Sequence, residues 1–459
     1  MQSLKTVCQC ENLGGIFMLL PCQNAQFIKK NYLDKYIYGQ NEATRDLATA
    51  IANHFLACEY NELCDSDSKI KTSSILLAGP SGSGKTEFAR TLKRLCDNYF
   101  SCGYYYMGSS STYSPNSTWK GQKSIDRIIS DLYYNCLLKF YENHPDNDDT
   151  DYMITTVKKI CENAIILLDE SDKVFKKDNY DCERTSSHDY QSSLLKLVEG
   201  TDVETDTFTH ERRVPVANST TGQIEFETME ETVESTTINT EGIMWIFLGA
   251  FDGIEKITAQ RIQRENNKDT TVHHDYYQCC RAGFIQDVSA TTKTANNPTP
   301  VKIPPPNVDD LVEYGVKREL AGRLAVRVRF NPLNVSTLIR IMQTCPTSAY
   351  REFQQRFKLL NCELHADYKA LKFVAEKCLK NGHNGTGARA LQAILYEILS
   401  PVMYELSAES EPCVCRLTGK RLRCGLPPII EKQKLQNTQS DEEFMRIINN
   451  SKIIKTESA

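Results

Sequence analysis

The chain has 459 residues, of which 40% are hydrophobic and 25% charged, and its formal net charge is -5. This balance suits a globular protein of two or three domains, and it lacks the basic excess of a dedicated nucleic-acid binder. No apolar run approaches the roughly 20 residues of a bilayer-spanning helix, so we expect neither a nucleic-acid nor a membrane partner. Residues 15–21 are apolar, but Glu11 precedes them and no arginine occurs before Arg45, which argues against a secretory or mitochondrial leader.

Eighteen cysteines are scattered along the chain without a repeating frame. Without an export signal, this pattern predicts reduced thiols in an intracellular compartment, with the cytoplasm favoured and the mitochondrial matrix as the alternative. Two groups resemble half of a zinc site, namely Cys8, Cys10 and Cys22, and then Cys413, Cys415 and Cys424. Neither group has two closely spaced pairs at zinc-finger spacing, so we do not expect bound zinc.

The predicted elements alternate between helix and strand. From Asn41 to Phe55 apolar residues recur every four positions, which indicates an amphipathic helix. From Ser74 a short apolar strand leads into a glycine-rich turn and a second helix, and further apolar runs lie near Ala164 and Ile243. Short apolar strands separated by helical segments indicate a parallel sheet that is covered on both faces. The predicted fold class is therefore α/β.

Two polar segments interrupt this pattern, at about 201–241 and 265–309, and we expect loops or insertions outside the core. After Asn331 the sequence is typical of helices and has few strand signals. The predicted organisation has four parts: an N-terminal segment (1–30), a large α/β domain (31–330), a small helical domain (331–432) and a polar tail (433–459).

Residues 79–86, GPSGSGKT, match the phosphate-loop pattern G-x-x-x-x-G-K-[ST] completely. The glycines let backbone N–H groups turn inward around phosphates, and the following helix adds its positive N-terminal dipole end. Lys85 supplies a charge to the outer phosphates, and the Thr86 hydroxyl can hold Mg²⁺. The loop's predicted ATP contacts are Gly79, Pro80, Ser81, Gly82, Ser83, Gly84, Lys85, Thr86 and Glu87.

Asp169 and Glu170 close the apolar strand that begins near Ala164. Parallel strands place their carboxyl ends at a ligand crevice. We therefore predict that Asp169 binds Mg²⁺ and that Glu170 polarises the water that attacks the γ-phosphate. A solvated edge or a helix cap is the alternative for such a pair, but an upstream phosphate loop favours catalysis. Together the two motifs predict an NTPase.

Five further segments resemble AAA+ ATPases of the ClpX/HslU (Clp ATPase) family, and ClpX most closely. They are IYGQNEATRDLATAIANHF from Ile37, YQSSLLKLVEGT from Tyr190, GAFDGIEKI from Gly249, DDLVEYGVKRELAGRL from Asp309 and GTGARALQAILYEILSPVMYEL from Gly385. Their shared order over roughly 35–410 is more specific than a phosphate loop alone. The resemblance implies an AAA+ P-loop domain with a parallel sheet, followed by a small α-helical Clp-type domain. It also implies ATP and Mg²⁺ as ligands and a homo-hexameric ring.

The resemblance assigns roles to four further residues. Arg323 is the arginine finger that reaches the nucleotide of the neighbouring subunit, and Arg389 is the sensor-2 residue of the helical domain. Ile37 and Tyr38 line the adenine pocket. The alternatives are ordinary surface positions for the two arginines and core packing for Ile37 and Tyr38. The strand that ends at Gly249 offers no polar residue for a sensor-1 role.

Trp119, Lys120 and Gly121 align with the aromatic-aliphatic-glycine loop that lines the central channel in this family. Polar residues surround Trp119, which suits an exposed loop, and a large rigid aromatic offers contact area at low entropic cost. The family usually has tyrosine and an aliphatic residue where this chain has Trp119 and Lys120. Packing of Trp119 under its own loop is the alternative.

Ala282, Gly283 and Phe284 fall where the family carries an aliphatic-Gly-Phe loop that docks a peptidase. Alanine removes most of the apolar anchor, which leaves docking to a ClpP-like peptidase open. The predicted function is that of an ATPase of the ClpX type, which acts as an unfoldase on unfolded or tagged protein substrates. The rivals are a remodelling chaperone that works without a peptidase and a nucleic-acid-associated AAA+ motor, against which the acidic balance counts.

Overall fold

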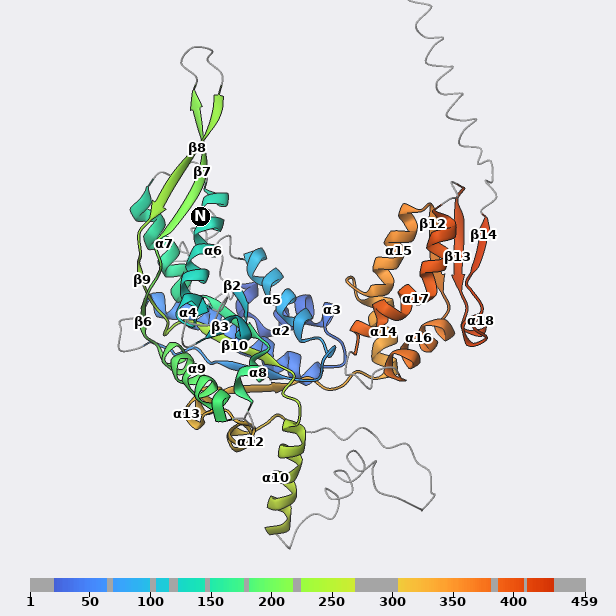
Figure 1. Cartoon of the computed structure of the whole chain (residues 1–459), viewed down its shortest axis with the longest axis horizontal. Helices are drawn as coiled ribbons and strands as arrows, with labels where there is room; N and C mark the ends of the chain where they lie inside the picture. Colours follow the sequence, from blue (N-terminus) through green and yellow to red (C-terminus); the bar gives the residue numbers. More distant parts are fainter. Residues whose placement is uncertain are drawn as a thin grey trace, which may run out of the picture. The chain divides into compact units, whose positions relative to one another are not determined.

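The structure is a computed structural model of the whole chain. It describes residues 20–63, 69–99, 105–114, 123–144, 149–176, 181–217, 224–268, 304–380, 387–407 and 411–432. The chain divides into two compact units, Met1–Leu333 and Asn334–Ala459 (Figure 1). Within the described ranges, none of the helices combines the length and apolar character needed to cross a membrane.

The first unit is built on a five-stranded sheet with the order β11-β1-β10-β5-β2, in which all neighbouring strands run parallel. The strands are β1 (Ile75–Ala78), β2 (Tyr105–Ser109), β5 (Ile165–Asp169), β10 (Met244–Gly249) and β11 (Val326–Arg329). Every residue of β1 and β10 is buried, as expected for central strands that are covered on both faces. The structure therefore confirms the predicted α/β fold with a parallel sheet.

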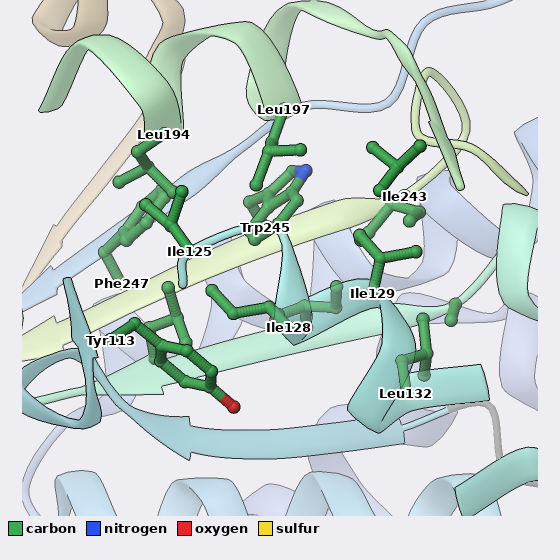
Figure 2. Close-up of a cluster of buried hydrophobic side chains, with 14 of the residues drawn as sticks. Tyr113, Ile125, Ile128, Ile129, Leu132, Leu194, Leu197, Ile243, Trp245 and Phe247 are labelled. Carbon is green, nitrogen blue, oxygen red and sulfur yellow. The ribbon is translucent and has the colours of Figure 1, made fainter. Parts of the chain in front are cut away.

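Helices cover the two faces of this sheet. On one face lie α4 (Asn41–Leu63) and α5 (Lys85–Tyr99), and on the other lie α6 (Arg127–Asn143), α7 (Thr150–Glu162) and α9 (Asp181–Glu199). Each face has its own cluster of buried side chains, the first with α4 and α5 and the second with α6, α7 and α9. Successive residues of a strand point to opposite faces, so Ile75 and Leu77 belong to the first cluster and Leu76 and Ala78 to the second. Figure 2 shows Leu194 and Leu197 of α9 pointing toward Trp245 and Phe247 of β10 in the second cluster.

Further elements belong to the first unit. They are η1 (Pro21–Gln23), α2 (Ala25–Ile28), η2 (Lys29–Leu33), α3 (Asp34–Tyr36), η4 (Ser110–Thr112), β3 (Tyr113–Ser114), β4 (Lys123–Ser124), α8 (Ser171–Phe175), α10 (Ile254–Lys268), α12 (Val308–Tyr314) and α13 (Arg318–Arg323). The predicted helix from Asn41 is present and runs to Leu63. Cys22, Ile28 and Leu33 are buried in the same core cluster as α4, so the chain joins this core before residue 31.

The polar segment 201–241 forms strands, whereas its composition suggested loops outside the core. The strand β6 (Asp202–Glu204) pairs with β9 (Thr237–Asn239), and β7 (Phe208–Ala217) pairs with β8 (Ile224–Val233) as a projecting antiparallel hairpin (Figure 1). Val203, Val233 and Ile238 are buried in the core. A two-stranded ribbon pairs its backbone groups across the strands, so it needs few apolar side chains and its composition does not reveal it.

The second unit is mainly helical, as predicted. Its helices are α14 (Val335–Thr344), α15 (Ala349–Leu359), α16 (Tyr368–Lys380), α17 (Arg389–Leu406) and α18 (Gly419–Arg423). It also contains a sheet of β12 (Cys362–Ala366), β13 (Cys413–Leu417) and β14 (Ile429–Lys432), which the sequence pattern did not predict. These strands are four or five residues long and mix apolar with charged residues, so they present no apolar run of the kind that marks a buried strand.

Candidate active site

The phosphate loop lies at the carboxyl end of β1, between Ala78 and the start of α5 at Lys85. Gly82 and Gly84 have φ values of 73° and 110°, a backbone region that favours glycine. A Cβ added to Gly79 would come within 2.9 Å of the Phe330 side chain. Three glycines of the motif are thus required by the local backbone and by its close approach to Phe330.

The polar groups of the loop suit an anion. Lys85 Nζ donates to the Gly79 and Pro80 carbonyl oxygens, the latter at 2.9 Å, so the ammonium lies over the loop. The Ser83 hydroxyl is buried, and within the described part of the chain it has no hydrogen-bond partner. A buried hydroxyl without a partner is costly, and a phosphate oxygen would satisfy it. The loop geometry therefore fits a bound phosphate.

The acidic pair lies at the same edge of the sheet, at the end of β5. Asp169 Oδ1 accepts a hydrogen bond from the Glu170 N–H at 2.8 Å. Glu170 adopts a left-handed backbone with φ 58° and ψ 27°, which is uncommon for a residue other than glycine and turns the chain off the strand. Its carboxylate accepts from Ser109 Oγ at 3.2 Å and lies 2.8 Å from Lys173 Nζ.

Ser109 was not identified from the sequence. It is the last residue of β2 and stands opposite Asp169 in the parallel register. The only sequence signal for it would have been its place at the end of a short strand. Strand order, rather than any local pattern, brings Ser109 to Glu170.

Thr86, in the first turn of α5 after the phosphate loop, and Asp169, the last residue of β5, are both half-buried. Hydroxyl and carboxylate oxygens are the donors that Mg²⁺ prefers, so this pair fits a nucleotide-bound magnesium ion. Glu87 lies one residue further along α5, where its carboxylate is 3.0 Å from Arg94 and 3.4 Å from Arg90.

Ile37 and Tyr38 are buried, and Ile37 packs close to the loop. A Cβ on Gly84 would lie 3.9 Å from Ile37 and 3.8 Å from Phe330. The Tyr38 hydroxyl donates to the Lys35 carbonyl at 3.0 Å. Both residues therefore pack in the core, and Ile37 also lies beside the phosphate loop.

The next residues along the chain are tied to β11. The Gln40 amide donates to Asn331 O and accepts from Asn331 N, each at 2.8 Å. A cavity of about 500 Å³ lies beside this link and is lined by residues 39–43 and by the end of β11. A larger cavity of about 780 Å³ runs along α4 near Tyr60 and Ile70, and its lining includes none of the predicted site residues.

Arg323 lies on the side of the sheet where the parallel strands begin, opposite to the side where they end at the phosphate loop. It ends α13, and β11 begins three residues later, where the Val326 N–H donates to Ser74 O at the amino end of β1. The Arg323 guanidinium is 2.8 Å from Glu199 Oε1, and both side chains are exposed, at 53% and 40%. The sheet therefore separates Arg323 from the phosphate loop of its own chain.

The remaining predicted residues belong to other parts of the chain. Arg389 is exposed at the start of α17 in the second unit. The pore-loop and docking-loop predictions, at residues 119–121 and 282–284, lie outside the described residues.

The two half zinc sites differ in exposure. Cys22, Cys413 and Cys415 are buried, and burial raises the pKa of Cys22 to about 11. Cys424 is exposed, and Cys8 and Cys10 lie outside the described ranges. In the part of the chain that the structure describes, no three His, Cys, Asp or Glu side chains are grouped to hold a metal ion.

The amino-acid sequence is similar to one family of ATPases and to several curated proteins. A model of the ATPase family associated with various cellular activities (AAA) matches residues 75–224, from the first residue of β1 to the first residue of β8, and this range includes the acidic pair. The ATP-dependent Clp protease ATP-binding subunits ClpX of Borrelia duttonii and Borrelia recurrentis are each 30% identical over 385 residues, which cover 83% of this chain and 74% of the relative. The ClpX subunit of Treponema denticola is 29% identical over 378 residues, which cover 82% of this chain and 76% of the relative.

Proposed function

This chain belongs to the ClpX family of AAA ATPases and hydrolyses ATP, and from this premise we propose that it uses the energy of hydrolysis to unfold proteins. In this proposal six copies form a ring, and each cycle of hydrolysis pulls polypeptide through the central channel. The proposal rests on one observation: the phosphate loop, Asp169 and Glu170 share one sheet edge in a chain that is similar to ClpX over most of its length.

Within one copy, the loop N–H groups and Lys85 hold the ATP phosphates. Thr86 and Asp169 hold Mg²⁺, which when bound neutralises charge on the phosphates. Glu170 acts as the general base toward water, and Ser109 and Lys173 orient its carboxylate. Ile37 and Tyr38 line the adenine pocket, and Arg389 is the sensor-2 residue.

Arg323 acts on the nucleotide of a neighbouring copy. Its place at the amino edge of the parallel sheet supports this role, because the phosphates bind at the carboxyl edge. Its ion pair with Glu199 does not oppose the role, since an exposed pair of this kind contributes about 0.2–1 kcal/mol and is easily exchanged. A guanidinium supplied in this way stabilises the charge that develops on the transferred phosphoryl group.

Residues 119–121 line the channel, and residues 282–284 belong to the segment where the family docks a peptidase. The names of the similar ClpX proteins associate them with the Clp protease. In this chain Ala282 stands where the family has a larger aliphatic residue, which supports a second candidate function: a remodelling chaperone that works without a peptidase.

The test of the proposal is Trp119→Ala. We expect ATP turnover to stay within about 2-fold while unfolding of a tagged fluorescent protein is lost, because the substitution removes the apolar grip but leaves the nucleotide site intact. The readouts are phosphate release and loss of fluorescence.

The matched control is Tyr404→Ala, which likewise removes one aromatic side chain; Tyr404 lies in the second unit and is 82% exposed. It should leave both activities unchanged. Undiminished unfolding by the Trp119→Ala protein would place Trp119 outside the channel.

A further inference from the structure

The carboxyl end of β10 carries no polar side chain, yet its backbone contacts both halves of the active site. The Gly249 carbonyl accepts from the Gly79 N–H of the phosphate loop at 3.3 Å. One residue later, the Ala250 N–H donates to Asp172 Oδ1 at 3.2 Å. Asp172 lies on α8, whose N-cap residue is Glu170. Two hydrogen bonds thus run from the phosphate loop, through β10, to the helix that Glu170 begins.

The contact between Asp172 and β10 is tight. A Cβ on Gly249 would lie 2.6 Å from Asp172 Oδ1 and 2.6 Å from the Phe251 ring. Phe251 has φ 51°, a strained backbone for a residue other than glycine, and its side chain is 1% exposed. Its ring packs 6.4 Å from Phe175 of α8, measured between centroids. The end of β10 is therefore held against α8 by both a carboxylate and an aromatic contact.

The charge of Asp172 is also linked to the phosphate loop. Burial raises the pKa of Asp172, and the charge of Asp252 adds to this rise. The hydrogen bond from Ala250 and the positive charge of Lys85 lower the same pKa. Asp172 therefore lies within electrostatic reach of the phosphate-loop lysine while it holds the end of β10.

We propose that Asp172 is a positioning residue for ATP hydrolysis, whose carboxylate fixes the end of β10 and so sets the spacing between the phosphate loop and Glu170. A general base must stand within hydrogen-bond reach of the attacking water, and a displacement of about 1 Å can cost about 100-fold in rate. Asp172 acts through the backbone atoms at the end of β10, because β10 has no polar side chain there. The inference concerns hydrolysis, and it does not depend on protein unfolding.

The experiment compares Asp172→Ala with Asp172→Asn. The alanine variant loses the acceptor for Ala250, so we expect kcat for ATP to fall about 10- to 100-fold with KM changed less than about 3-fold. The asparagine variant keeps an acceptor oxygen at the same place, so its kcat should stay within about 3-fold of the unmodified chain. Asp252→Ala is the matched control, because it removes an exposed neighbouring charge and leaves the hydrogen bond in place.

Three outcomes would overturn the proposal. An alanine variant with unchanged kcat would remove any role in hydrolysis. Equal losses for alanine and asparagine, or an equal loss for Asp252→Ala, would assign the effect to charge. A raised KM with unchanged kcat would assign Asp172 to nucleotide binding.

A second variant covers the case in which Asp172→Ala fails to fold. Gly249→Ala leaves Asp172 in place but introduces a Cβ at the contact, so it should displace the carboxylate and lower kcat by a similar factor. In a chain that tolerates both changes, the double variant should lose less than the two single losses combined, because both act on one contact. Fully additive losses, or a Gly249→Ala protein with unchanged kcat, would show that the contact does not position Glu170.

Discussion

The carboxyl and amino ends of the strands in the central sheet, here called its carboxyl and amino edges, differ in how their polar groups are held. At the carboxyl edge, hydrogen bonds link the ends of neighbouring strands, as between Ser109 and Glu170 and between Gly79 and Gly249. At the amino edge, Arg323 is exposed and pairs with Glu199 at the surface. The first edge holds an ordered set of groups for phosphate and water, and the second holds a cation that its own site does not receive. In the proposed function, hydrolysis therefore uses two copies, with the phosphate site from one and Arg323 from the other.

The largest expected effect comes from removing the cation of the amino edge. Arg323→Ala should lower ATP turnover by about 10³-fold or more, which is the lower end of the effect of arginine fingers in well-studied nucleotide hydrolases. The readout is phosphate release at saturating ATP. Arg318→Ala is the matched control, since it removes an exposed arginine from the same helix.

A mixing experiment decides whether the finger acts between copies. In a random equal mixture of Arg323→Ala and Glu170→Gln chains, about one contact in four joins an intact base to an intact finger, so part of the turnover should return. A mixture that stays inactive would mean that Glu170 and Arg323 must come from one chain. That result would contradict the proposal that Arg323 acts on a neighbouring copy.

A slightly smaller effect is expected at the carboxyl edge. Glu170→Gln should lower turnover by about 10²- to 10⁴-fold and preserve ATP binding, because the amide keeps the shape of the side chain and cannot take a proton. Binding of a fluorescent ATP analogue and phosphate release separate the two effects. Glu397→Gln, a surface carboxylate in the second unit, should change neither. Near-normal hydrolysis by the Glu170→Gln protein would remove Glu170 as the base.

The smallest effect is expected from the partner of the finger. Glu199→Gln weakens an exposed ion pair worth about 0.2–1 kcal/mol, so turnover should change by less than about 5-fold and should tend to rise as Arg323 is released. Steady-state turnover against ATP concentration is the measurement. A loss as large as that of Arg323→Ala would instead mean that Glu199 holds the guanidinium in its working position.

The amino-acid sequence was sufficient to predict the parallel α/β fold, the phosphate loop and the place of the acidic pair. Each of these follows from a local pattern: a glycine that allows a left-handed backbone, an apolar run that fills a buried strand, or a carboxylate at the end of that strand. The hairpin β7–β8 could not be predicted in this way, because a ribbon can pair its backbone without an apolar face.

Tertiary structure decided which polar groups meet. Ser109 bonds Glu170 across 61 residues, Ala250 bonds Asp172 across 78, and Gln40 bonds Asn331 across 291. Arg323 and the phosphate loop lie at opposite ends of the strands, and this too follows from strand order and direction. Local patterns encode backbone angles and the periodicity of burial, whereas the partners of a side chain depend on strand register, which is set only when the whole sheet has assembled.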